Sequence, residues 1–166
     1  LSSGCVIGTQ GFGFVEHEGT HHHIPQIGGV EIGEDTVIGA NSCVDRGTMK
    51  PTRIGDRCRI GVQVQLAHNT QVGDDTVFED QSGLAGSVTV GKNCRIGAQA
   101  GLAGASTMGD NSSVGPRAGV TRKVPSNTEM WGFPARPKAE AMRNVAALSL
   151  LAKMFAKEGK LPNPEA

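Results

Sequence analysis

The chain has 166 residues, enough for one domain, and its 16 basic and 16 acidic side chains cancel. This balance gives no basic footprint for nucleic acid and no charged patch for an anionic membrane surface. Aromatic residues make up 4% of the chain and tyrosine is absent, so small and β-branched side chains must form the core. The four cysteines are scattered without a C-x-x-C pair, which favours a reduced, cytoplasmic compartment. No apolar run approaches the length of a membrane span.

Residues 9–26 (TQGFGFVEHEGTHHHIPQ) lack the repeat that fills most of the chain, and we expect them to form a loop that protrudes from the body. Four of the five histidines lie in this loop, three of them in succession at His21–His23. Neighbouring residues of an extended segment point to opposite sides, so these histidines make poor joint ligands for one metal ion. We therefore expect a solvated loop and no metal site.

The clearest pattern is a hexapeptide repeat. Every sixth residue from Ile54 to Val120 is aliphatic or Phe, and a similar run, Ile32–Val44, precedes an insertion at residues 46–51. Glycine often follows the aliphatic residue, and another small side chain often lies four positions after it. A period of six fits neither an α-helix, with a period of about 3.6, nor a simple strand, with a period of about 2.

The repeat predicts an all-β fold, a left-handed parallel β-helix with three hexapeptides in each coil. The aliphatic residue would point into the prism, and the small residue would fill the space beside it. Glycine would allow a sharp bend at each corner. In this register Cys58 and Cys94 are core residues rather than reactive thiols.

The repeat ends after Pro125, and residues 131–137 (WGFPARP) are expected to form a turn-rich link. Residues 138–157 are predicted to form a C-terminal α-helix with a broad apolar stripe. A lone helix cannot bury such a stripe, so we expect it to pack against the prism or against other subunits. The last residues, 159–166, contain two prolines, and we expect a frayed tail.

The predicted organisation is therefore a β-helix over residues 1–130, from which the loop 9–26 protrudes, and a linker, helix and tail over residues 131–166. The sequence starts at Leu1 rather than Met, which favours a chain trimmed from a longer protein.

One histidine, His68, lies within the repeat. It follows the inward Leu66 by two positions, so its side chain should project outward, where faces of neighbouring subunits can meet. That position suits a catalytic base and equally an ordinary exposed polar residue. One coil further in the same column lies Gly86, and two coils further lies Gly104. Glycine beside the histidine would leave room for a slim ligand arm and an oxyanion at the backbone N–H. Both glycines also suit plain turns, which is our interpretation of Gly104.

Three segments resemble the UDP-3-O-acylglucosamine N-acyltransferases of lipid A synthesis. They are Gln65–Asn69 (QLAHN), Gly11–Phe14 (GFGF) followed by Ile24–Gly28 (IPQIG), and Val44–Gly47 (VDRG). The resemblance covers roughly residues 4–157. It implies a homotrimer that moves a 3-hydroxyacyl group to the 2-amino group of a UDP-linked acylglucosamine. The acyl donor would be the phosphopantetheine arm of acyl carrier protein, with no permanently bound cofactor and a nucleotide sugar as acceptor.

Carried over by position, the resemblance makes His68 the general base and Gly86 the residue whose N–H faces the developing oxyanion. Arg122 matches a basic residue near the arm of the carrier protein. The substrate-binding residues implied besides Arg122 are Gln65, Asn69, Phe12 and Phe14.

The sequence departs from the family at three points. Gly61 stands where the family has an aspartate that pairs with its histidine, and Ala105 stands where it has a second histidine. The amino-terminal domain that grips the uracil is absent, which implies either a trimmed chain or a different acceptor. One coil after Gly61 lies Glu79, and our hypothesis is that Glu79 replaces the missing carboxylate and orients His68.

Three alternatives remain open. The first is another hexapeptide acyltransferase, which would use acetyl-CoA or a different sugar acceptor. A groove for a long acyl chain near Gly119 and Thr121, where the residues are small, would argue against this alternative. A zinc carbonic anhydrase on the same prism needs three converging histidines, of which the repeat supplies only His68. A non-catalytic β-helix scaffold is favoured by Gly61 and Ala105.

Overall fold

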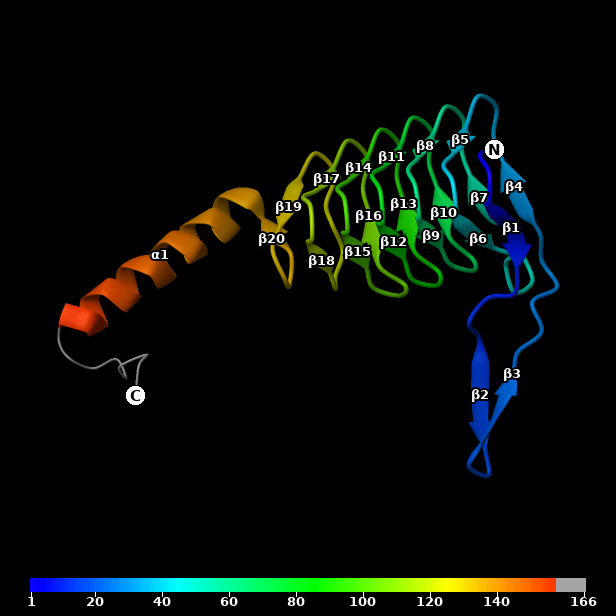
Figure 1. Cartoon of the computed structure of the whole chain (residues 1–166), viewed down its shortest axis with the longest axis horizontal. Coiled ribbons are helices and arrows are strands. Elements are labelled where there is room, and N and C mark those ends of the chain that lie inside the picture. Colours follow the sequence, from blue (N-terminus) through cyan, green and yellow to red (C-terminus); the bar gives the residue numbers. More distant parts are fainter. Residues whose placement is uncertain (158–166) are drawn as a thin grey trace.

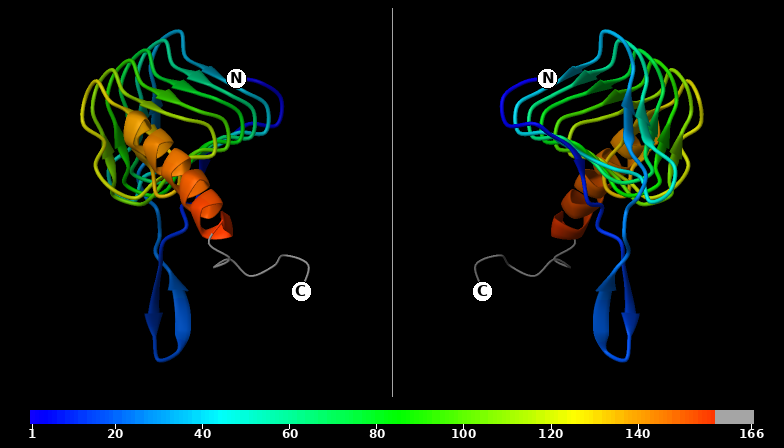
Figure 2. Two further views of the ribbon diagram at one scale, coloured as in Figure 1. Left: turned by 90° about the vertical axis from the view of Figure 1, so that its left-hand side faces the viewer. Right: turned by 90° about the vertical axis from the view of Figure 1, so that its right-hand side faces the viewer.

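The computed structural model describes residues 1–157, which wind into a three-sided parallel β-helix (Figure 1). The end-on views show the triangular cross-section (Figure 2). Face 1 consists of β1 (Val6–Thr9), β6 (Cys43–Asp45), β9 (Gln65–Leu66), β12 (Gly83–Leu84), β15 (Gly101–Leu102) and β18 (Gly119–Val120). Face 2 consists of β4 (Val30–Ile32), β7 (Thr52–Ile54), β10 (Gln71–Val72), β13 (Thr89–Val90) and β16 (Thr107–Met108). Face 3 consists of β5 (Val37–Ile38), β8 (Arg59–Ile60), β11 (Val77–Phe78), β14 (Arg95–Ile96), β17 (Ser113–Val114), β19 (Glu129–Trp131) and β20 (Arg136–Pro137).

The structure confirms the predicted left-handed parallel β-helix, and the strand register confirms three hexapeptides in each coil. On face 1, Leu66 pairs with Leu84 and Leu84 pairs with Leu102, so each residue meets its equivalent three hexapeptides further along the chain. One coil is longer, because Cys43 pairs with Gln65 across the insertion at residues 46–51. This inserted loop lies at the edge between faces 1 and 2, next to the segment that carries His68.

The repeated aliphatic residues fill the prism as predicted. Leu66 and Ile96 are fully buried, and Phe78 is 1% exposed. Cys58 and Cys94 belong to the same core, and burial raises the pKa of both thiols. Their burial confirms that they are core residues. A thiol with a raised pKa also forms little of the reactive thiolate.

The corners of the prism correct one expectation about glycine. The left-handed backbone conformation recurs every six residues at residues other than glycine, for example Asn69, Asp75 and Gln81 with φ of 62°, 58° and 61°. The repeated glycines have ordinary φ, but a Cβ on Gly73 would lie 2.7 Å from the backbone of the next coil. Their role is therefore to let adjacent coils approach, and not to bend the chain.

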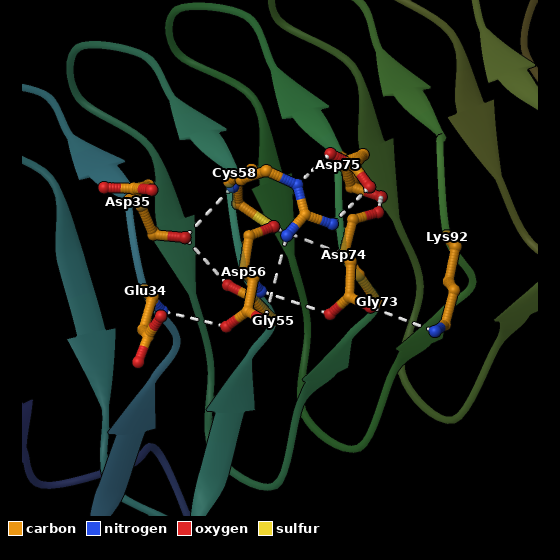
Figure 3. A network of polar contacts seen from close by, with 12 residues as sticks. Glu34, Asp35, Gly55, Asp56, Cys58, Gly73, Asp74, Asp75 and Lys92 are labelled. Carbon is orange, nitrogen blue, oxygen red and sulfur yellow. Dashed lines mark hydrogen bonds and ion pairs between the residues drawn. The ribbon is translucent and has the colours of Figure 1, made fainter.

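Polar side chains tie the coils together along the edge between faces 2 and 3 (Figure 3). Oδ1 of Asp56 accepts the amide of Glu34 at 2.8 Å, and Oδ1 of Asp74 accepts the amide of Asp56 at 3.1 Å. Asp74 also pairs with Lys92 at 2.9 Å. Exposed ion pairs contribute little, so the main effect of this ladder is to satisfy amides that the turns leave without a backbone partner.

The segment predicted as a loop at residues 9–26 is instead largely a β-hairpin. Its antiparallel strands β2 (Phe14–His17) and β3 (Thr20–His23) project away from the first coils (Figure 1). The sequence of this segment lacks the hexapeptide period. It also lacks a clear alternation of apolar and polar residues, the usual sign of a strand, because both faces of the hairpin are exposed.

The predicted C-terminal helix is present as α1 (Lys138–Lys157), which extends beyond the last coil (Figure 1). Its apolar residues Met142, Val145 and Leu148 are exposed, so the prism does not bury the stripe. Within residues 1–157, no helix combines the length and apolar character needed to cross a bilayer. The tail expected at residues 159–166 lies outside the described residues.

We expect Gly73→Ala to lower the thermal unfolding midpoint, because the new methyl group meets the backbone of Gly91 and Lys92 at 2.7 Å. Overpacking of this kind costs about 1–3 kcal/mol. The measurement is circular dichroism during heating. Gly101→Ala is the control, because a Cβ there meets nothing within 4 Å. Equal midpoints for the two variants would contradict the assignment of the repeated glycines to coil stacking.

Candidate active site

His68 lies at the edge between faces 1 and 2, directly after β9, and is half-buried. Its neighbour Leu66 fills the core, whereas the imidazole lies outside it. The ring packs against a glycine of the next coil and a glycine of the hairpin stem, which consists of residues 9–13 and 24–26 on either side of β2 and β3. The predicted outward placement is therefore confirmed.

Two glycines enclose the imidazole. A Cβ on Gly86 would lie 2.6 Å from Cε1 and 2.7 Å from Nε2 of His68, and a Cβ on Gly11 would lie 2.8 Å from Nδ1. Gly86 and Gly11 must therefore lack side chains if the ring is to keep this position. Gly11 is fixed in turn by the hairpin, since Nε2 of His23 lies 3.2 Å from its carbonyl oxygen. A Cβ on Gly104, one coil further, would have only the carbonyl oxygen of Gly86 within 4 Å, at 3.5 Å, in agreement with a plain turn position.

Some hydrogen-bonding groups of the imidazole and of the backbone beside it lack partners among the described residues. Nδ1 of His68 is buried and has no partner among the described residues. Within residues 1–157, the amide N–H of Gly86 also has no backbone acceptor, and the same is true of Gly104. An oxyanion near Gly86 would find a free donor there.

Asn69 belongs to a polar network that the repeat did not reveal. Its side chain accepts from the amide of Thr48 at 2.8 Å and donates to the Thr48 hydroxyl at 3.0 Å. The same hydroxyl donates to the side chain of Gln26, a residue that is 2% exposed. Gln26 joins the hairpin stem through Gln10, whose side-chain oxygen accepts its backbone amide at 3.2 Å. The network holds the hairpin stem and the inserted loop against the segment that carries His68.

The Glu79 hypothesis needs correction. Glu79 follows β11 on face 3, at a different edge of the prism from His68, and its carboxylate binds Arg95 and the amide of Ala98. The hydrogen bond from Arg95 is the main cause of its lowered pKa. Gly61 lies at that same edge, against Asp80 of the next coil. Within one chain, Glu79 therefore does not orient His68.

A second carboxylate, that of Asp45, lies at the end of β6, and β6 pairs with β9, the strand that leads to His68. Asp45 is 5% exposed, and its Oδ1 accepts a hydrogen bond of 3.0 Å from the side chain of Gln65. The segment Val44–Gly47 carries part of the family resemblance, and the sequence alone did not show that its aspartate is buried. The insertion at residues 46–51 shifts the register of the coils, so counting by coils does not place Asp45 at the end of the strand next to β9.

Phe12, Phe14 and Gln65 meet at a pocket of about 540 Å³ between the hairpin stem and face 1. The two rings lie edge to face with centroids 5.5 Å apart, and Phe12 is 83% exposed. Asp45 and His23 also line this pocket. The structure therefore brings together three predicted substrate-binding residues close to His68, which Gln65 precedes by three positions.

Face 1 also carries an open groove of about 470 Å³ that includes Gly119 and Thr121. Its floor is a column of glycines, because the outward position of Gln65 is followed by Gly83, Gly101 and Gly119 in successive coils. Phe133 covers the far end, where a Cβ on Gly119 would meet its ring.

Arg122 is exposed and lies in the column of His68, three coils further along. At the strand spacing this is about 14 Å from His68, so the two do not touch. Among the described residues, no group of three or more His, Cys, Asp or Glu side chains has the geometry to hold a metal ion.

These features are consistent with acyl transfer. The imidazole can take a proton from a nucleophile, the Gly86 amide can receive negative charge, and the pocket and the groove open onto the same face of the prism.

Comparison with known proteins agrees with the fold and this chemistry. Residues 87–122 match the bacterial transferase hexapeptide (six repeats), and residues 29–49 and 51–78 match the hexapeptide repeat of succinyl-transferase. Curated proteins named UDP-3-O-acylglucosamine N-acyltransferase are similar over a shorter stretch. The protein from Pseudomonas entomophila (strain L48) is 51% identical over 72 residues, which is 43% of this chain and 20% of that protein. The protein from Pseudomonas syringae pv. syringae (strain B728a) is 44% identical with the same coverage.

Among solved structures, the UDP-N-acetylglucosamine O-acyltransferase (LpxA) of Moraxella catarrhalis RH4 has a TM-score of 0.71 and 25% identity, covering 95% of this chain and 70% of that one. PerB from Caulobacter crescentus, solved with CoA and GDP-perosamine, has a TM-score of 0.54 and 25% identity, covering 65% of this chain and 54% of that one. The chain spans about a fifth of the length of the curated relatives it matches. The chain is thus a hexapeptide-repeat β-helix protein related to the UDP-3-O-acylglucosamine N-acyltransferases.

Proposed function

We propose that this chain is the β-helix part of an acyltransferase that moves a 3-hydroxyacyl group from acyl carrier protein to the 2-amino group of a UDP-linked acylglucosamine. The observation that carries the proposal is the imidazole of His68, enclosed by Gly11 and Gly86 next to an aromatic pocket and a glycine-floored groove. The curated relatives with this name support the choice of reaction.

In this reaction the acceptor amine attacks the thioester carbonyl of the phosphopantetheine arm, and His68 takes the proton that the nitrogen loses. The carbon–nitrogen bond forms, and the negative charge on the carbonyl oxygen faces the amide of Gly86. When the intermediate collapses, the carbon–sulfur bond breaks, and the proton on His68 passes to the departing thiolate. The products are an amide and the free thiol of the arm.

The two cavities suit two parts of such substrates. The pocket with Phe12 and Phe14 offers aromatic faces and the polar Gln65 to a sugar, while the groove over Gly83, Gly101 and Gly119 offers a smooth apolar path to an acyl chain. Arg122, at the far end of the His68 edge, offers a cation to the carrier arm.

A homotrimer is part of the proposal. The support is the exposed apolar stripe of α1, including Met142, Val145 and Leu148, which copies of the helix would cover. The cysteines of the chain are unpaired, which suits a reducing cytoplasm.

The second candidate is a hexapeptide acyltransferase that uses CoA and a different nucleotide sugar. The similarity to PerB, which was solved with CoA and GDP-perosamine, favours it. A non-catalytic scaffold is the third, because Gly61 and Ala105 replace residues of the related enzymes. The following experiments separate the three.

We expect His68→Ala to lower acyl transfer by roughly 10²–10⁴-fold, because the reaction loses its base. The assay mixes the chain with 3-hydroxyacyl carrier protein or acyl-CoA and a panel of amino sugars linked to nucleotides, and detects the amide by mass spectrometry. His22→Ala, in the exposed hairpin, is the control. Transfer from CoA alone would favour the second candidate, and no transfer by the unmodified chain would favour the scaffold.

Gly86→Ala should also inactivate the protein while leaving its fold intact. The added methyl group would lie 2.6 Å from Cε1 of His68 and must displace the ring. Gly104→Ala, at the matched position one coil further, meets its nearest atom at an ordinary 3.5 Å and should keep its activity. Equal activity of the two variants would rule out a special position for Gly86.

Gly101→Leu should shift the preferred donor toward shorter acyl chains. A Cβ at Gly101 meets nothing within 4 Å, so the leucine fills the groove without disturbing the prism. The measurement is kcat/KM for carrier-protein thioesters of increasing chain length, with Gly101→Ala as an intermediate step. An unchanged length preference would show that the acyl chain takes another path.

A further inference from the structure

The imidazole of His68 is held between two stretches of backbone. Gly86 of the next coil lies against its Nε2 edge, and Gly11 of the hairpin stem lies against its other edge, where a Cβ would come within 2.8 Å of Nδ1. The next coil is fixed by the strand register. The stem belongs to the segment that leaves the prism, so its position against the ring depends on whatever holds Gly11.

The backbone of the stem has few partners near Gly11, although Gly11 is buried. At either end of this stretch, the carbonyl oxygens of Thr9 and Gly13 accept the amides of Arg46 and Ile24. Between them, at residues 10–12, the described part of the chain supplies one hydrogen bond to the backbone. It joins Nε2 of His23 to the carbonyl oxygen of Gly11 at 3.2 Å.

The chemistry of this contact fixes the protonation of the donor. A carbonyl oxygen can only accept a hydrogen bond, so Nε2 of His23 must carry a proton. Both the neutral tautomer with that proton and the imidazolium satisfy this condition. The hold on Gly11 therefore does not require His23 to be charged.

Only one face of the hairpin can make this contact. His23 is the last residue of β3 and lies directly opposite Phe14 of β2. Opposed residues share one face of a hairpin, and both of these line the pocket beside Gln65. The adjacent His22 points to the other face, because successive side chains of a strand alternate. His22 is therefore a matched control for His23.

We propose that His23 is a positioning residue of the acyl-transfer site: its hydrogen bond to the Gly11 carbonyl keeps the stem against His68 and fixes the imidazole that acts as base. The proposal rests on the proposed function, because it needs His68 as a base. A ring confined between Gly11 and Gly86 meets the acceptor amine in one orientation, and a small misplacement of a reacting group lowers a rate strongly.

The first test measures how accessible His68 is, without any substrate. Diethyl pyrocarbonate modifies accessible imidazoles, and the tryptic peptide of residues 60–92 contains His68 and no other histidine, so mass spectrometry follows this residue alone. In His23→Ala, modification of His68 should become about tenfold faster, because the stem loses a hydrogen bond and uncovers the ring. His23→Gln, which keeps an N–H donor, should restore most of the protection, and His22→Ala should leave it unchanged.

The second test separates positioning from binding of the acceptor, since His23 also lines the pocket. In the acyl-transfer assay, His23→Ala should lower kcat several-fold and change KM for the acceptor little, with recovery of kcat in His23→Gln. A raised KM with unchanged kcat would instead describe a residue that only binds the acceptor. The thermal unfolding midpoint should stay unchanged, because the hairpin lies outside the prism.

Unchanged modification of His68 in His23→Ala, or an equal increase in His22→Ala, would overturn the proposal. The labelling experiment decides whether His23 holds the stem against His68 even if the unmodified chain transfers no acyl group. In that case the proposed function fails separately, and a faster modification in His23→Ala would describe a structural contact without a catalytic use.

Discussion

The close stacking of one coil on the next is the constraint on which the whole molecule depends. From β7 to β18, parallel strands pair at a constant interval of three hexapeptides on all three faces, so each side chain lies above its equivalent in the previous coil. This stacking leaves no room for a Cβ at positions such as Gly55, Gly73 and Gly91, where it would lie 2.7 Å from backbone atoms of the next coil. Glycine at these positions serves the contact between coils, and the left-handed turns are made by residues such as Asn69 and Asp75.

The same register turns sequence positions far apart into columns, and the columns create the surfaces of the candidate site. A column of glycines makes the groove on face 1, while a neighbouring column places Gly86 against His68. A regular prism alone would nevertheless present His68 as one more polar residue on an edge. Its environment is made by the two segments that depart from the repeat, the hairpin stem and the loop at residues 46–51.

The polar groups in and beside these irregular segments are of two kinds, those with hydrogen-bond partners and those without. The network through Gln26, Thr48 and Asn69 is satisfied and holds the hairpin stem to the prism. Burial raises the pKa of Asp45, and Nδ1 of His68 is buried without a partner among the described residues. Polar groups left in this state are typical of sites that have a substrate or a proton still to receive. The exposed helix α1 is a second unsatisfied feature, and copies of the chain are the partner we propose for it.

The repeat by itself determined the architecture, the register of the coils and the inward residues, because a strictly periodic pattern specifies which side chains share a column and a face. The apolar stripe after the repeat determined the span of α1. The repeat also placed His68 outside the core and Gly86 beside it. Only the tertiary structure decided that residues 14–23 form a hairpin, that Glu79 binds Arg95, and that Asp45 is buried with Gln65 as its hydrogen-bond donor. The physical reason is that the insertion at residues 46–51 and the hairpin interrupt the period. Where the period fails, contacts depend on how the chain packs in space, and counting along the sequence no longer predicts them.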